Sequence, residues 1–372
     1  MLFTQKRKYR NMPLMTQILV WMNFLPIKKK AIKKIILVVT IGALIVIFAG
    51  NIATVDQAAY NDIYMGMIPS GYFEKGYQML CSISRSIGID YKLFKLIISG
   101  MAIFLLKKAF SVDSKVWSTA ISIWALTSFW HDAEQSRFTM AYIVVLYAFK
   151  YLNAADWKSQ MKYCLCILLA GQLHTAAYIY FVLVLLFTRN KNRVIFFIDF
   201  LAISFSLFVA INGNDMSFVG DVLYKITKYE RIRMWFNFKT NFGYLGVLLL
   251  QILLHALLYY AKTILGNSQA ENKFYEKKIV GLAFDVNALL FVALPLYMVS
   301  TDFIRIIRGM FLFDYMVLAI AYYNASKVKN KYCLACGIAI FGITYNLYIF
   351  GSPIGAFSSD YFMPMITKNS LL

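Results

Sequence analysis

The stretch "KKIILVVTIGALIVIFAGNIATVDQ", residues 33–57, decides the fold of this protein. No charged residue occurs between Lys34 and Asp56, and a helix of about 20 such residues crosses the ~30 Å of hydrocarbon in a bilayer. The polar segment that follows is more typical of a retained first crossing than of a cleaved leader. The sequence therefore predicts a membrane protein whose first crossing lies at 35–55.

The composition and the distribution of charge agree with this interpretation. Of the 372 residues, 60% are hydrophobic and only 15% are charged, whereas a soluble domain is about a quarter charged. Nine of the 38 lysines and arginines precede Ile35, in a segment without any acid. This asymmetry is typical of a cytoplasmic segment beside anionic lipid, so the net charge of +20 does not indicate nucleic acid. Residues 1–34 are predicted to be a basic cytoplasmic tail, and "MPLMTQILVWMNFLP" (12–26) in it can lie on the inner leaflet.

Apolar runs recur along the rest of the chain, without an internal repeat or a linker. They predict an all-α polytopic domain over 35–350, with crossings at about 35–55, 92–106, 116–130, 138–152, 194–211, 242–261, 279–299, 303–324 and 332–350. The polar segments 56–91 and 212–241 are predicted to be outer loops, and 351–372 a C-terminal tail. The expected architecture is thus about nine crossings.

One further stretch, "KYCLCILLAGQLHTAAYIYFVLVLLFTRNKNR" (162–193), fits two topologies. It has basic residues at both ends, with Gly171, Gln172 and His174 in its middle. It is either one tilted crossing or a hairpin of two half-helices that enters and leaves on the inner side. A polar centre with a glycine suits a broken helix that lines a protein-enclosed cavity, so we favour the hairpin, with His174 at its buried tip.

With the hairpin, the polar residues of several segments face the outer side. In the first outer loop, carboxylates that can accept sugar hydroxyls alternate with aromatic rings that can stack on sugars; they are Tyr60, Asp62, Tyr64, Glu74 and Tyr77. The same composition also suits an ordinary capping and turn segment. The turn "FWHDAEQSRF" (129–138) adds His131 and Arg137. The loop 212–241 is basic against the positive-inside trend, which indicates an anionic ligand; its cations are Lys225, Lys228, Arg231, Arg233 and Lys239.

Two arginines near the outer end of a crossing are candidates for binding phosphate. Arg305 and Arg308 are three residues apart and share one helix face. A guanidinium presents a fixed fork of donors to phosphate oxygens, so with Arg137 these arginines suit a diphosphate. The alternative is that both contact lipid headgroups or pair with Asp302.

The three histidines have different surroundings. His174 is a candidate general base because the unperturbed pKa of imidazole lies near neutral pH, and the alternative is a core histidine that hydrogen-bonds to a backbone carbonyl. His131 is a second candidate base or a solvated loop residue, and His255 is interpreted as structural. No metal-ligand set, P-loop or dinucleotide turn is present, and Cys333 and Cys336 lack a second pair. Any chemistry is therefore expected to need no metal or cofactor.

Four short motifs, taken together and in this order, resemble the EpsG-like branch of the Wzy-type O-antigen and capsule polymerases. They span about residues 50–325 and are "DQAAYNDIYMG" with "GYFEKGYQML", "QSRFTMA", "LAGQLHTAAYIYFVLVLL" and "VSTDFIRIIRGMFLFDY". The chain departs from the family pattern at Gly309 and Met310, where the family often has an aromatic pair, and at Thr175, where serine is common. Neither departure alters the charge arrangement.

The resemblance implies a GT-C-like helical bundle in the bacterial cytoplasmic membrane, with a cytoplasmic N-terminus. Its implied activity is metal-independent transfer of a growing glycan from undecaprenyl diphosphate onto a lipid-linked oligosaccharide repeat unit at the outer face. Arg137, Arg305 and Arg308 would stabilise the departing diphosphate, and His174, or else His131, would deprotonate the acceptor hydroxyl. Side chains that would position the glycan are Asp62, Glu74, Tyr229, Arg231 and Arg233.

The implied partners are the lipid-linked oligosaccharide, membrane lipid and a chain-length regulator protein. Two other functions fit the same residues. A flippase or transporter of lipid-linked glycan would bind diphosphate without chemistry, although transporters usually show a repeat symmetry that this sequence lacks. A membrane O-acyltransferase would use a buried histidine on an acyl donor.

Overall fold

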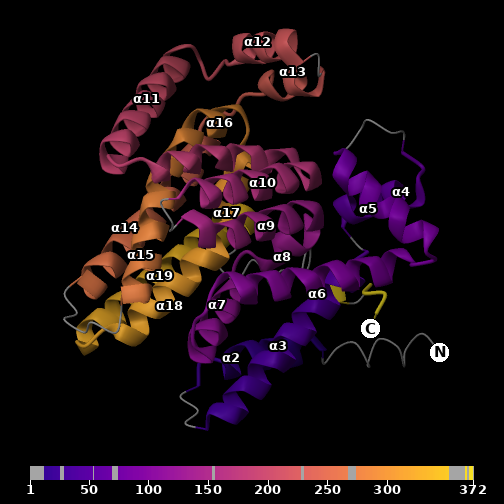
Figure 1. Ribbon diagram of the computed structural model, residues 1–372, viewed down its shortest axis with the longest axis vertical. Coiled ribbons are helices and arrows are strands. Elements are labelled where there is room, and N and C mark those ends of the chain that lie inside the picture. Colours follow the sequence, from indigo (N-terminus) through magenta and orange to yellow (C-terminus); the bar gives the residue numbers. More distant parts are fainter. Residues whose placement is uncertain are drawn as a thin grey trace. The chain divides into compact units, whose positions relative to one another are not determined.

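The computed structural model describes residues 12–25, 29–52, 54–68, 74–152, 156–227, 230–266, 274–351, 365–366 and 368–371. Over these residues the regular structure is helical, without a strand (Figure 1). Five of the described helical segments are long and apolar enough to cross a membrane: Lys30–Gly50, Lys191–Ile211, Gly243–Gly266, Phe274–Val299 and Val328–Phe350. Each coincides with a predicted crossing, so the chain is an all-α polytopic membrane protein, as predicted.

The chain forms two compact units, and each is built from segments that are distant in sequence. The first comprises Met1–Phe181, Met310–Tyr323 and Gly342–Leu372, and the second Val182–Gly309 and Asn324–Phe341. The boundaries fall within or at the ends of helices, which explains why the sequence shows no linker.

The first unit holds the N-terminal half of the chain. Its elements are α2 (Met12–Met22), α3 (Lys30–Gly50), α4 (Val55–Met65), α5 (Lys75–Ser86), α6 (Tyr91–Ala109), α7 (Ser114–Leu126), α8 (Phe129–Glu134), α9 (Ser136–Leu152), α10 (Trp157–Leu173), the start of η1 (Thr175–Phe187), most of α18 (Phe311–Asn324) and the end of α19 (Val328–Phe350).

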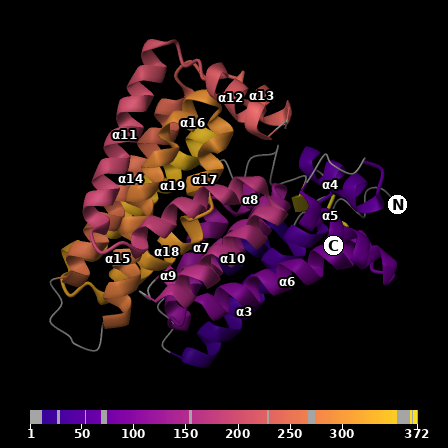
Figure 2. The same ribbon diagram turned by 45° about the horizontal axis from the view of Figure 1, so that its top comes forward.

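Three helices, α7, α9 and α18, form the core of this unit. Most of their residues are buried, including several polar ones. The ring of Phe313 in α18 lies 5.1 Å from both Phe110 and Phe149. By contrast, α3 and α6 lie side by side (Figure 2). Both helices expose large apolar residues, such as Val38 in α3 and Phe104 in α6. Polar residues on α7, α9 and α18 are therefore surrounded by protein rather than by lipid.

The stretch around His174 is a hairpin. The helix α10 ends at Leu173, His174 is extended, and the 3₁₀-helix η1 begins at Thr175. The hydroxyl of Tyr163, about three turns before this break, donates to the carbonyl oxygen of Tyr180, two turns of 3₁₀-helix after it, at 2.7 Å. If the chain continued in one direction, these residues would be nearly 30 Å apart, at ~1.5 Å per α-helical and ~2.0 Å per 3₁₀ residue. The chain therefore reverses at His174, as expected for the favoured hairpin, and the side of the membrane from which it enters stays a prediction.

The C-terminal residues contact the end of the first crossing. The amide of Ser370 donates to the carbonyl oxygen of Gly50 at 2.8 Å, and the Asn369 side chain donates to the carbonyl of Ile47 at 3.3 Å. The tail thus supplies hydrogen-bond donors to carbonyl groups in the last turn of α3.

The second unit contains the remaining elements. They are α11 (Lys191–Ile211), α12 (Ser217–Thr227), α13 (Glu230–Phe236), α14 (Gly243–Gly266), α15 (Phe274–Leu289), η3 (Leu290–Ala293), α16 (Leu294–Val299), η4 (Thr301–Ile304), α17 (Arg305–Arg308) and the first part of α19. Within the predicted outer loop 212–241, α12 and α13 pack against each other (Figure 1). Polar pairs join α14 to its neighbours: His255 Nδ1 lies 3.0 Å from Asn287 Oδ1, and Tyr297 donates to Gln251 at 3.0 Å. His255 is thus structural, as interpreted from the sequence.

Two predicted crossings are interrupted. The segment 116–130 is divided into α7 and α8 by a turn at Thr127 and Ser128. The segment 303–324 was expected to be a single helix, but the structure divides it into η4, α17 and α18, with a turn at Gly309 and Met310. Glycine in a helix interior costs about 1 kcal/mol relative to alanine, which favours a break at Gly309.

Candidate functional site

The first candidate residue, Arg137, lies in the first turn of α9 and is only 5% exposed. Its guanidinium forms an ion pair with the carboxylate of Glu74, the residue that precedes α5. The ring centres of Tyr60 and Tyr77 lie 5.2 and 5.6 Å from the guanidinium carbon, within cation–π range. Burial raises the pKa of Tyr77 well above its usual value, so this phenol is neutral. One positive charge is therefore enclosed by two aromatic rings and one carboxylate.

Glu74 also connects α5 to the hairpin. Its Oε1 accepts a hydrogen bond from the backbone N–H of Thr175 at 2.8 Å. Gly76, two residues later, allows this approach: a Cβ there would lie 2.6 Å from the Gln172 Cβ and 2.8 Å from its carbonyl oxygen. The segment before α5, the start of α9 and the hairpin tip thus meet at Glu74.

Replacing Gly76 by alanine is expected to destabilise the protein by about 1–3 kcal/mol, because the methyl group overlaps the backbone of Gln172. Gly100→Ala in α6 is the matched control, since nothing lies within 4 Å of its added Cβ; there we expect a gain of about 0.5–1 kcal/mol. Thermal unfolding in detergent measures both. Equal unfolding temperatures for the two variants would contradict the close packing of α5 on the hairpin.

His174 lies at the hairpin tip and is 9% exposed. Its Nδ1 accepts the backbone N–H of Ala176 at 3.2 Å, and its ring meets the Phe138 ring edge-on at 5.4 Å. Because Nδ1 is an acceptor, the neutral ring carries its proton on Nε2. For Nε2 to act as the predicted base, the ring proton must move to Nδ1, and the hydrogen bond from Ala176 to Nδ1 must break. In the tautomer that this hydrogen bond requires, Nε2 is a hydrogen-bond donor.

The turn before α9 contains one fully buried charge. Asp132 is buried, and its Oδ2 accepts from Trp124 Nε1 at 2.7 Å and from the Tyr142 hydroxyl at 3.4 Å. His131 is half-buried, with Nδ1 3.5 Å from the Tyr345 hydroxyl. Asp132 therefore fixes the turn structurally, a role that sequence analysis did not assign.

A buried lysine in α6 was also missed. Lys95, which is 1% exposed, donates from Nζ to the carbonyl oxygen of Asn51 at 2.5 Å and to Gln57 Oε1 at 3.1 Å. The Gln57 amide in turn donates to the carbonyls of Ala133 and Glu134, at 3.1 and 2.7 Å. This chain of hydrogen bonds holds the break between α8 and α9, immediately before Arg137. The available signal was a lysine inside a predicted crossing, a position that is costly unless the residue has a role.

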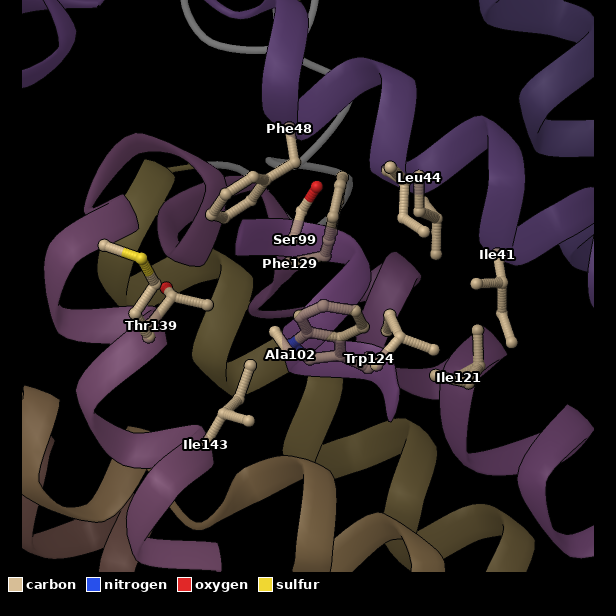
Figure 3. Close-up of a pocket in the computed structure, with 13 residues that line it drawn as sticks. Ile41, Leu44, Phe48, Ser99, Ala102, Ile121, Trp124, Phe129, Thr139 and Ile143 are labelled. Carbon is tan, nitrogen blue, oxygen red and sulfur yellow. The ribbon is translucent and has the colours of Figure 1, made fainter. Parts of the chain in front are cut away.

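A small pocket lies beneath this turn, between α3, α6, α7, α8 and α9. Its volume is about 30 Å³, and Figure 3 shows its lining, with Ile41 of α3 and Thr139 of α9 on opposite sides. Trp124 and Thr139, which line it, also hydrogen-bond to Asp132. The pocket has room for about one water-sized group and is almost wholly apolar, so it is not a sugar site.

The two other arginines that were predicted to bind diphosphate, Arg305 and Arg308, belong to the second unit. Arg308 is 1% exposed, so its guanidinium does not reach lipid headgroups. Arg305 donates from Nε to the carbonyl of Asp302 at 2.8 Å, with the two side chains 3.6 Å apart, and its guanidinium carbon lies 6.0 Å from the Trp235 ring. Arg305 thus makes the Asp302 contact considered as the alternative.

The remaining candidates are placed as follows. Asp62 is half-buried on α4, two residues after Tyr60 and therefore on the opposite side of the helix from the ring that contacts Arg137. Arg233 is exposed on α13 and pairs with Asp221 at 2.8 Å. Tyr229 and the side chain of Arg231 lie outside the described residues. In the described part of the chain, no group of three or more His, Cys, Asp or Glu side chains could hold a metal ion.

The fold and this site define a polytopic membrane protein in which an arginine, a carboxylate and a histidine gather at the tip of a hairpin. The chain belongs to the EpsG family: the family model matches residues 14–365, nearly the whole chain. This is a Wzy-like, polymerase-type family, so the resemblance seen in the motifs is confirmed, and the family indicates a polysaccharide-polymerase-like function. No curated protein and no solved structure matches the chain.

Proposed function

We propose that this protein polymerises polysaccharide by transferring a growing glycan from undecaprenyl diphosphate onto a lipid-linked oligosaccharide repeat unit. In this reaction the acceptor hydroxyl oxygen bonds to the anomeric carbon of the donor sugar. The bond from that carbon to the diphosphate oxygen breaks, and the hydroxyl proton leaves to a base. The observation that carries the proposal is the buried Arg137 guanidinium beside the hairpin tip of a polymerase-type family member.

Arg137 is proposed to stabilise the leaving diphosphate. Negative charge on the diphosphate increases as the sugar departs, and a preorganised cation in a water-poor site stabilises that charge more than water does. A guanidinium offers paired N–H donors to phosphate oxygens. The tyrosine rings that contact Arg137 exclude water from the same charge.

His174 is proposed to take part in the transfer of the acceptor hydroxyl proton. Its ring lies against Phe138, the neighbour of Arg137, which supports a role in the same reaction. With a proton exchanged onto Nδ1, Nε2 would accept the hydroxyl proton; in the present tautomer, Nε2 would donate to a diphosphate oxygen. The roles predicted for Arg305, Arg308, Asp62, His131, Tyr229, Arg231 and Arg233 stay predictions, as does a chain-length regulator as partner.

The proposed orientation has the N-terminus in the cytoplasm of a bacterium. The basic, acid-free segment before Ile35 supports it. On this orientation, the last turn of α3, the C-terminal residues bound to it and the Arg137 site all lie toward the outer face. The contacts of Asn51 and Gln57 with the α8–α9 turn support this placement within the first unit.

The test uses purified protein in liposomes that contain a synthetic lipid-diphosphate oligosaccharide, with product length followed on a gel. We expect a ladder of lipid-linked polymer. Transbilayer movement of labelled lipid without a ladder would instead identify a flippase. Acyl transfer from an added acyl donor, with no ladder, would identify the O-acyltransferase alternative.

A further inference from the structure

The carboxylate of Glu74 binds to two donors that suit a phosphate oxygen equally well. One oxygen pairs with the Arg137 guanidinium, and the other accepts the Thr175 N–H at 2.8 Å. Both side chains are nearly buried, with 6% of Arg137 and 11% of Glu74 exposed. A cationic fork beside a backbone N–H at the start of a helix is an arrangement that binds oxyanions, and here the chain's own anion fills it.

Glu74 and a bound phosphate cannot share these donors. Both are anions, and two like charges at contact distance in a water-poor site repel each other strongly. The rings of Tyr60 and Tyr77 lie against the same guanidinium. An incoming phosphate therefore reaches Arg137 by replacing the carboxylate rather than by adding beside it.

The position of Glu74 allows this exchange. Glu74 is the N-cap residue of α5, yet its side chain makes no capping hydrogen bond to that helix. Once released from Arg137, the carboxylate can turn to the free N–H groups at the start of α5, where a negative charge is stabilised by the helix dipole. While it pairs with Arg137, the carboxylate balances a buried positive charge, which would be costly if left alone.

We propose that Glu74 is an internal substitute for phosphate, which a phosphate group of the ligand displaces from Arg137 and Thr175. This inference rests on the proposed function and deepens it, because it assigns Glu74 to the diphosphate rather than to the glycan. It predicts that removing the Glu74 charge strengthens phosphate binding, whereas a glycan-binding or purely structural Glu74 predicts weaker or unchanged binding.

The experiment measures binding of inorganic pyrophosphate to the full-length protein in nanodiscs by calorimetry, for the wild type, Glu74→Gln and Arg137→Met. Pyrophosphate is expected to bind Glu74→Gln at least about tenfold more tightly than the wild type, and Arg137→Met not at all. Glu276→Gln, in the second unit, is the control for the change in net charge and should bind like the wild type. Farnesyl diphosphate and phosphatidylglycerol nanodiscs, as separate arms, distinguish a prenyl diphosphate from a lipid headgroup as the source of the phosphate.

Equal or weaker binding by Glu74→Gln would overturn the inference. Should Glu74→Gln fail to fold, Glu74→Asp is the second variant: it retains the charge but is one methylene shorter, and it should also bind pyrophosphate more tightly. If Arg137→Met binds pyrophosphate as well as the wild type, the diphosphate contact of the proposed function fails, whatever Glu74 does.

Discussion

Arg137→Met is expected to lower polymer formation by about 10³-fold, the cost of removing a preorganised cation from a developing phosphate charge. The side chain is buried, pairs with Glu74 and lies against two tyrosine rings, so its charge is held in place by the fold. Arg137→Lys retains the charge but loses the fork of donors. It should therefore regain part of the activity, at about 10²-fold below the wild type.

The measurement is the initial rate of polymer formation in liposomes, normalised to folded protein. Arg193→Met, at the exposed start of α11, is the matched control and should leave the rate within about twofold. Because Arg137→Met leaves Glu74 buried without its partner, we also expect a loss of about 3–5 kcal/mol in stability. A folded Arg137→Met that polymerises at the wild-type rate would rule out this arginine as the diphosphate ligand.

His174→Ala is expected to reduce the rate by about 10²–10⁴-fold, the usual contribution of a positioned proton-transfer group. His174→Gln distinguishes the two roles proposed for the ring, which are to accept the hydroxyl proton or to donate a hydrogen bond to the diphosphate. A glutamine amide can donate a hydrogen bond to a diphosphate oxygen but cannot take a proton from a hydroxyl. Activity retained in His174→Gln therefore indicates a donor, and activity lost in both variants indicates a base.

The pH dependence provides the second readout for His174. If the neutral ring is the base, the rate falls as pH drops through the imidazole pKa, and this limb disappears in His174→Gln. His255→Gln is the control, since His255 pairs with Asn287 in the second unit and should affect stability but not the pH profile. A wild-type pH profile in a folded His174→Ala variant would remove this histidine from the mechanism.

Most of the helices could be predicted from the sequence. The path of the chain around His174 could not be decided from the sequence alone. Long uncharged runs locate a crossing because hydropathy and length are local properties of the chain. The stretch around His174 has the same composition in a tilted crossing and in a hairpin. Only the contact of Tyr163 with Tyr180 distinguishes them. The break at Gly309 was missed because a single glycine inside an apolar run is a weak signal.

The site was predicted as separate residues rather than as an arrangement. Glu74, Arg137 and His174 were each named, but their contact depends on how three distant segments pack. Gln57 was missed because it looks ordinary in its own segment, and Lys95 because its position inside a predicted crossing does not by itself reveal a partner. Their role follows from hydrogen bonds to the turn before α9.

The sequence by itself determined that this is an all-α membrane protein with a basic, acid-free N-terminal segment, because the cost of placing charge in hydrocarbon acts on each segment separately. Only the tertiary structure decided which polar groups satisfy one another. The carboxylate of Glu74 could have capped α5 or bound a sugar; packing of α5 on the hairpin instead places it between Arg137 and Thr175. That choice depends on contacts between segments far apart in the chain, since a buried charge is stable only where another segment brings its partner.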